Sequence, residues 1–112
     1  MTLEQIINAL KCEVIHKGNS FDTNIINIFA GDIMSEVFLS DKENRVFVTA
    51  LTTDQVVKTA ENVKAIGIIL VNGKQPQNSM RNHVVESNIT LLSTNLSMFE
   101  VCVALGKLLE KC

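Results

Sequence analysis

Three short polar segments of the sequence carry residue types that bind small anions. They are TALTTDQ (49–55), NGKQP (72–76) and STNLS (93–97), and each follows an apolar segment. Their hydroxyl, amide and backbone N–H groups are hydrogen-bond donors, and such groups at helix N-termini hold phosphates. The same residue types also close turns and cap helices. The three segments are therefore either parts of one ligand site or three separate helix caps.

Motifs of several common enzyme classes are absent from the sequence. There is no G-x-x-x-x-G-K-[ST] P-loop, no G-x-G-x-x-G fingerprint and no G-x-S-x-G nucleophile elbow. Cys12, Cys102 and Cys112 form neither a CxxC pair nor a metal-binding pattern. His83 is predicted to lie in a helix without a carboxylate or cysteine partner, so we expect a surface or boundary residue. We therefore expect no catalytic residue, no metal ion and no cofactor.

Length and composition indicate one globular domain that spans residues 1–112. Hydrophobic residues make up 46% of the chain and charged residues 20%, and the net charge of -2 argues against a nucleic-acid partner. The longest apolar run, 65–71, is too short to cross a membrane. The N-terminal residues lack the basic region of a secretory signal, and the odd cysteine count suggests reduced thiols. We therefore expect a cytoplasmic protein.

The first 45 residues alternate between short elements and polar turns. A possible capping box at Thr2 and Gln5 predicts a helix over about 2–10, and strands follow over 12–15 and 25–30. The next segment, 31–39, predicts a helix, and Asp32 either caps this helix or contacts a ligand. The residues expected on one face of this helix are Ile33, Met34, Val37 and Phe38.

From Val46 onward, predicted strands alternate with predicted helices. The strands are expected over 46–49, 66–71 and 89–92, and the helices start at Thr53, at Pro76 and at Asn95. The second helix is expected to end at about 86 and the third at 111. Right-handed crossovers would make these strands parallel, with helices over the sheet. The sequence therefore predicts a small α/β domain with a largely parallel sheet.

A parallel sheet places every strand-to-helix turn at the same edge, where its strands have their carboxyl ends. The three polar segments should therefore meet and form one pocket for a small anionic ligand, such as a nucleotide or another phosphorylated metabolite. The residues expected to line it are Thr49, Thr52, Thr53, Asp54, Asn72, Gly73, Ser93, Thr94 and Asn95, with Asp32 as a further candidate.

The C-terminal helix is more apolar than contact with one sheet face requires. Such contact needs an apolar stripe about 100° wide, whereas apolar residues occupy most of the circumference of helix 95–111. Either the N-terminal segment or a second chain could bury the surplus. We expect a homodimer. The contributors to its interface that this pattern predicts are Met34, Phe38, Met98, Val101 and Leu105.

The order and spacing of several short motifs resemble the DRTGG domain family. The resemblance covers about residues 26–105 and includes Gly31-Asp32, the T-x-x-T-x-x-Q turn at 49–55, Gly73 with Pro76, and the segment 92–100. It implies a three-layer α/β/α fold like that of the N-terminal domain of HPr kinase/phosphorylase. The stretch that names the family, Asp-Arg-Thr-Gly-Gly, falls on 51–55, where only Thr53 agrees.

In larger proteins, domains of this family accompany CBS domains in regulated pyrophosphatases or precede phosphotransacetylase. The resemblance therefore implies a regulatory or dimerising module without HPr kinase activity. Short stand-alone members are similar to proteins encoded beside redox and signalling genes, including iron hydrogenases. A redox or signalling protein is thus a further expected partner. The alternative function is a pure interaction or assembly module that binds no small ligand.

Overall fold

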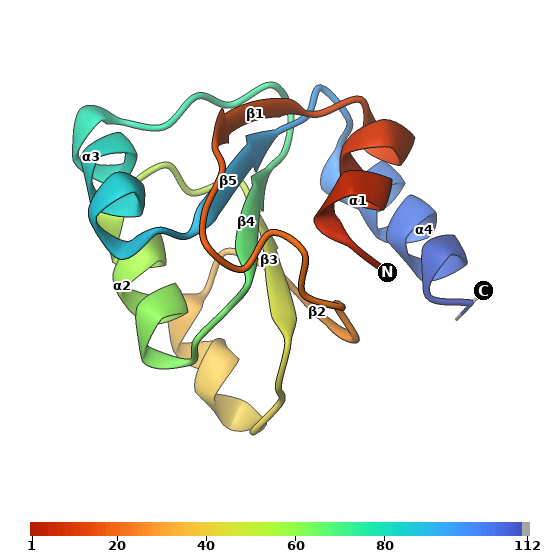
Figure 1. Ribbon diagram of the computed structural model, residues 1–112, viewed down its shortest axis with the longest axis horizontal. Helices are drawn as coiled ribbons and strands as arrows, with labels where there is room; N and C mark the ends of the chain where they lie inside the picture. Colours follow the sequence, from red (N-terminus) through yellow and green to blue (C-terminus); the bar gives the residue numbers. More distant parts are fainter. Residues whose placement is uncertain (111–112) are drawn as a thin grey trace.

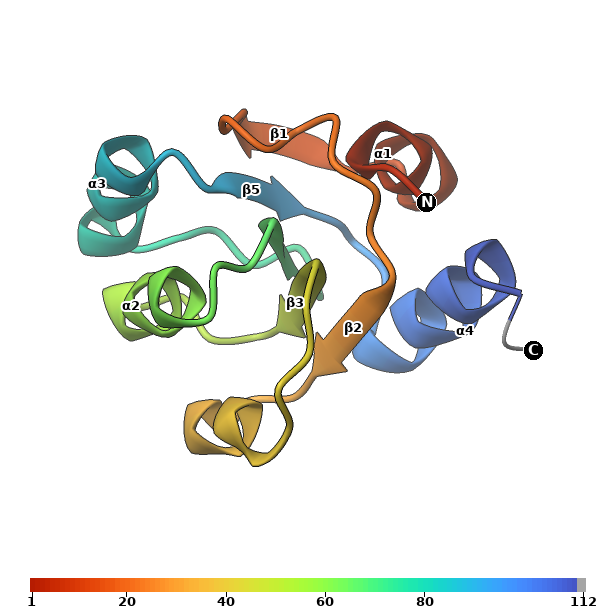
Figure 2. The same ribbon diagram turned by 60° about the horizontal axis from the view of Figure 1, so that its bottom comes forward.

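Five strands form a single sheet with helices on both faces (Figures 1 and 2). A computed structural model describes residues 1–110 of the chain. In chain order the elements are α1 (Leu3–Leu10), β1 (Glu13–His16), β2 (Asn27–Ala30), the 3₁₀ helix η1 (Met34–Leu39), β3 (Arg45–Thr49), α2 (Asp54–Asn62), β4 (Gly67–Leu70), α3 (Asn78–Ser87), β5 (Thr90–Ser93) and α4 (Met98–Leu108).

The sheet has the strand order β1-β5-β4-β3-β2. Strands β2 to β5 are parallel to one another, and β1 pairs antiparallel with β5 at the opposite edge from β2. The predicted largely parallel sheet is therefore confirmed, and the N-terminal third supplies its two edge strands. Because β2 to β5 are parallel, their carboxyl ends all lie at the same edge of the sheet.

Helices cover the two faces of the sheet unequally, which gives the three layers seen in Figure 2. One layer holds α2, α3 and η1, and the other holds α1 and α4. Successive strand residues point to opposite faces, so Phe47 is buried toward α2 and α3 while Val46 and Val48 are buried toward α1 and α4. Burial on both faces explains why the central strands are almost continuously apolar.

Side-chain caps fix the starts of the first and last helices. The predicted capping box of Thr2 and Gln5 is present at α1, and Ser97 and Glu100 form a second one at α4. Hydrogen bonds from the Ser97 backbone and hydroxyl lower the pKa of Glu100. This second box starts α4 three residues later than predicted, and the predicted end at residue 111 lies outside the described residues. Helix α3 begins two residues after Pro76, with Gln77 as its N-cap.

The segment predicted as an α-helix over 31–39 is instead a 3₁₀ helix. A 3₁₀ helix has three residues per turn, so only residues three apart share a face. Met34 and Val37 are such a pair and are buried. Ile33 and Phe38, which an α-helix would have placed beside them, are 60% and 57% exposed. The prediction of one four-residue apolar face was therefore wrong.

Helix α1 covers much of the apolar surface of α4. Val101 and Leu105 are buried in one cluster with Leu3, Ile6 and Leu10 of α1. The expectation that Val101 and Leu105 contribute to a dimer interface was wrong, since their own chain buries them. Met34 is also buried within its own chain, whereas Phe38 is exposed and Met98 is half-buried. Among residues 1–110, no helix is long and apolar enough to cross a membrane.

Candidate functional site

The turns that follow β3, β4 and β5 lie at one edge of the sheet, because these strands are parallel. All ten residues predicted for the ligand site lie at this edge, in the turns or, for Thr49, Ser93 and Asp54, at the adjoining strand or helix ends. Asp32 lies in the turn after the neighbouring strand β2. The ten residues differ in burial. Thr49, Ser93 and Thr94 are buried, while the side chains of Asn72 and Asn95 are exposed. The predicted residues thus share one edge, with some inside the protein and some on its surface.

Asp32 binds the turn that follows β3. Its Oδ1 atom accepts a hydrogen bond from Thr49 Oγ1 at 2.8 Å and another from the Ala50 N–H at 2.9 Å. Thr49 Oγ1 in turn accepts from the Leu51 N–H at 3.2 Å. The residue at the N-cap of η1 is Ile33 and has no side-chain hydrogen bond, so Asp32 does not cap that helix. Its carboxylate instead joins the ends of β2 and β3.

Hydrogen bonds also join the turns that follow β4 and β5. The Asn72 and Gly73 N–H groups donate to the carbonyls of Leu96 and Thr94, each at 2.8 Å. Ser93 Oγ donates to the Lys74 carbonyl at 2.7 Å, and Thr94 Oγ1 to the Leu10 carbonyl at 2.8 Å. The buried hydroxyls of Ser93 and Thr94 therefore already have protein partners. Their hydrogen bonds hold the turns at this edge of the sheet in place.

The N-terminus of α2 presents free donors at this edge. Thr53, where this helix was predicted to start, is the N-cap, but its side chain makes no capping hydrogen bond. Among the described residues, the N–H groups of residues 52–55 have no hydrogen-bond partner. The Asp54 carboxylate lies 3.7 Å from both Lys58 Nζ and His83 Nδ1. These two groups offset part of its negative charge when His83 is protonated.

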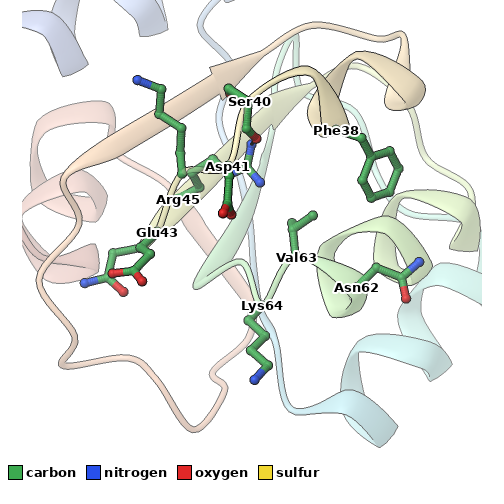
Figure 3. A pocket seen from close by; sticks show the side chains of 10 residues that line it. Phe38, Ser40, Asp41, Glu43, Arg45, Asn62, Val63 and Lys64 are labelled. Carbon is green, nitrogen blue, oxygen red and sulfur yellow. Dashed lines mark hydrogen bonds between the residues drawn. The ribbon is translucent and has the colours of Figure 1, made fainter.

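Two cavities lie at the opposite edge of the sheet, beside the amino ends of the parallel strands. The larger has a volume of about 610 Å³ and is lined by Phe38, residues 40–45 and residues 62–64. Figure 3 shows the side chains of the 38–45 segment on one side of this cavity and Asn62, Val63 and Lys64 on the other. The smaller, about 320 Å³, lies between residues 19–20, 60–66 and 87–89. None of the ten predicted residues lines either cavity.

Comparisons with known proteins bear on the fold. Neither a family model nor a curated protein matches the sequence. The chain is similar in structure to the CBS and DRTGG domains of the regulatory region of Clostridium perfringens pyrophosphatase, solved in complex with the activator diadenosine tetraphosphate. The TM-score is 0.71 at 14% sequence identity, over 92% of this chain and 45% of that one.

At this identity the likeness establishes the fold alone, and it supports the DRTGG-like α/β fold inferred from the sequence. This chain spans less than half of the pyrophosphatase regulatory region to which it is similar. Binding of the activator is therefore a property of that larger region.

Two residues with functional groups, Arg45 and His83, were not predicted from the sequence as parts of a site. Arg45 lines the larger cavity and is only 4% exposed, although the strand was predicted to begin one residue later. The sequence signal that could have identified Arg45 is its position as a charged residue directly before an apolar strand. His83, for which the sequence predicted no carboxylate partner, has its Nε2 atom 2.6 Å from Glu61 Oε1 and its Nδ1 atom near Asp54. The expected boundary position of His83 is confirmed, and its partners were not predictable because both carboxylates belong to α2, which packs beside α3.

Neither of the two described cysteines, Cys12 and Cys102, gives a sign of a reactive site. Burial raises the pKa of the Cys12 thiol to about 11 and also raises that of Cys102. Both thiols are therefore protonated at neutral pH, and a protonated thiol is a poor nucleophile and metal ligand. Cys112 lies outside the described residues. Within residues 1–110, no three His, Cys, Asp or Glu side chains gather in a way that could hold a metal ion.

Proposed function

We propose that this chain is a non-catalytic, cytoplasmic regulatory domain that binds a small anionic metabolite, such as a nucleotide. The observation that carries the proposal is the likeness in fold, over 92% of the chain, to a regulatory region solved with a nucleotide activator. Membership of the DRTGG family is part of the proposal and is supported by the same likeness.

The proposed site is the carboxyl edge of the sheet, at the N-terminus of α2. Four successive N–H groups, those of residues 52–55, have no described partner there. The helix dipole adds a partial positive charge at the same point. The exposed Asn72 and Asn95 side chains belong to neighbouring turns and could supply further donors. A phosphate would thus meet oriented backbone donors without requiring a lysine or arginine.

One observation favours the alternative, a pure interaction module. Several predicted donors at this edge, including the hydroxyls of Ser93 and Thr94, are already bound within the protein. In that case the polar turns only close the edge, and the protein acts through its exposed apolar side chains. The two functions differ in whether a phosphorylated compound stabilises the folded chain.

The ligand-binding prediction can be tested by a thermal-shift screen with nucleotides and phosphorylated metabolites. A compound that binds only the folded state, present at about 100 times its Kd, would raise the free energy of unfolding by about 2.7 kcal/mol. We expect Thr53→Glu to abolish this gain, because its carboxylate would occupy the anion position while remaining compatible with the helix dipole. Isothermal titration calorimetry would then give the affinity.

Asn8→Glu is the matched control, since it adds the same charge at an exposed position of α1. We expect this variant to bind like the unchanged protein. If no phosphorylated compound stabilises the chain, the alternative function is favoured. Turnover of a bound compound that is lost in a turn variant would contradict the proposed absence of catalysis.

We also propose that the chain forms a homodimer through the surface around η1. Ile33, at the N-cap of this helix, and Leu39, at its end, are 60% and 82% exposed. Both lie on one face of the 3₁₀ helix, whereas Phe38 lies on another. Monomers rarely leave such side chains together in water unless they form an interface. A stable two-fold interface would bury more than about 1,000 Å² in total.

Light scattering at micromolar concentrations tests the dimer, with a mass of twice 12.4 kDa expected. We expect Leu39→Ser to shift the protein toward monomer. Val14→Ser is the control, because Val14 is also exposed but lies on β1, at the far edge of the sheet. An unchanged mass of 12.4 kDa across the concentration range would exclude the dimer.

A further inference from the structure

Arg45 is a buried cation whose guanidinium is only partly used by the protein. It is the first residue of β3 and is 4% exposed. Nη1 donates to the Val37 carbonyl at 2.9 Å and to the Ser40 carbonyl at 3.5 Å, at the end of η1. Nε is fully buried and has no hydrogen-bond partner among residues 1–110. One edge of the guanidinium therefore supports η1, and the other is unpaired.

Nη2 is the part of the guanidinium that an anion in the cavity can reach, since Nη1 is bound and Nε is fully buried. Guanidinium N–H groups form charge-assisted hydrogen bonds with carboxylate and phosphate oxygens. Arginine also stays charged in proteins. A buried charge normally has a partner, because removal from water is costly without one. Yet no described carboxylate lies within salt-bridge distance of Arg45.

We propose that the cavity beside Arg45 binds a small phosphorylated molecule that carries a planar ring. The Nη2 group of Arg45 receives its phosphate, because Nη1 already bonds to carbonyls and Nε is fully buried. Lys64, on the other side of the cavity, adds a second positive charge to its lining. Both residues line the cavity in Figure 3. An anion at this position would supply the missing counter-charge of Arg45 and an acceptor for Nη2.

The remaining lining residues fit this ligand class. Phe38 is 57% exposed although it lines the cavity, so its ring is available to stack on a planar group. The volume of about 610 Å³ falls in the range of small-molecule sites. Three cations, including Lys42, and two carboxylates, Asp41 and Glu43, line the cavity, so its charge is +1 by count.

The ligand belongs to the same chemical class as in the proposed function, and the inference rests on that function for this choice of class. The binding site, however, is at the opposite edge of the sheet. The two sites are therefore separable by mutation. A variant at Arg45 leaves the N-terminus of α2 unchanged, and Thr53→Glu leaves the Arg45 cavity unchanged.

Isothermal titration calorimetry with AMP, adenosine and inorganic phosphate tests the inference. We expect AMP to bind the unchanged protein and adenosine not to bind, since adenosine lacks the phosphate. Arg45→Met should weaken AMP binding by at least about tenfold, because it removes a desolvated charge contact. Phe38→Ala should weaken AMP about fivefold, the effect of losing a stacked base, and leave phosphate binding unchanged.

Two variants keep the test decisive if Arg45→Met fails to fold. Lys64→Met removes an exposed cation and should weaken AMP about threefold, and Asp41→Asn removes a repelling charge and should strengthen it by a similar factor. Absence of AMP and phosphate binding would overturn the inference. So would binding that is unchanged by both Arg45→Met and Lys64→Met. If such binding were instead lost in Thr53→Glu, the carboxyl-edge site would be supported in its place.

Discussion

Replacement of Phe47 by alanine should remove a large part of the stability of this domain. Phe47 is on the interior strand β3, is completely buried, and packs edge-to-face on Phe29 with ring centroids 5.6 Å apart. Truncation of a buried phenylalanine to alanine costs about 3–5 kcal/mol, because apolar contacts are lost and a cavity remains. Domains of this size have about 5–15 kcal/mol in total. Urea denaturation followed by circular dichroism would measure the loss.

Phe99→Ala is the matched control for Phe47→Ala. It makes the same change near the start of α4, where the side chain is 76% exposed. Little packing is lost there, so we expect a change within about 0.5 kcal/mol. Equal losses in the two variants would mean that Phe47 is not a core residue. The slope of the free energy against urea should stay the same in both proteins if unfolding remains two-state.

The architecture could be predicted because its signals are local. The apolar run over 66–71 and the helical pattern that precedes it are strong enough to give a strand–helix–strand unit, and handedness then makes the strands parallel. The segment 31–39 was harder. Its apolar residues at 33, 34, 37 and 38 suit an α-helix, and the 3₁₀ helix that forms instead, with Arg45 bound to its last carbonyls, depends on contacts made beyond the segment.

The side-chain partners at the two sites could not be predicted from the sequence. Parallel strands bring the ten predicted residues to one edge, but sequence does not reveal that the Thr94 hydroxyl binds the carbonyl of Leu10, 84 residues away. Nor does it reveal that η1 buries Arg45 without a carboxylate. The dimer prediction failed in detail for a similar reason. Sequence shows that α4 has surplus apolar surface, whereas the packing of α1 determines which part of it is covered.

Gly18 occupies a position where the backbones of two segments touch. It follows β1, and its N–H group donates to Thr90 Oγ1 at 2.9 Å, while the next N–H group, that of Asn19, donates to the Asn88 carbonyl at 3.0 Å. A Cβ atom at Gly18 would lie 2.1 Å from the Asn88 oxygen and 2.7 Å from the Thr90 nitrogen. Both are backbone atoms, so no side chain can rotate away to make room.

Gly18→Ala should therefore destabilise the domain by about 2–4 kcal/mol, the sum of an overpacking cost and two weakened hydrogen bonds. The chain would have to move away from the start of β5, and hydrogen exchange at the Asn19 amide should become faster as a result. Urea denaturation gives the free energy, and amide exchange shows whether the loss arises at this contact.

Gly31→Ala makes the same substitution where there is room for it. Its nearest neighbour would be a side-chain atom of Phe29 at 3.4 Å, and the backbone there is not in the left-handed region. Adding a Cβ at such a position reduces the freedom of the unfolded chain and typically stabilises a protein by about 0.4–1 kcal/mol. The two glycine variants should thus change stability in opposite directions. A Gly18→Ala protein as stable as Gly31→Ala would show that the segment after β1 does not lie against Asn88 as described.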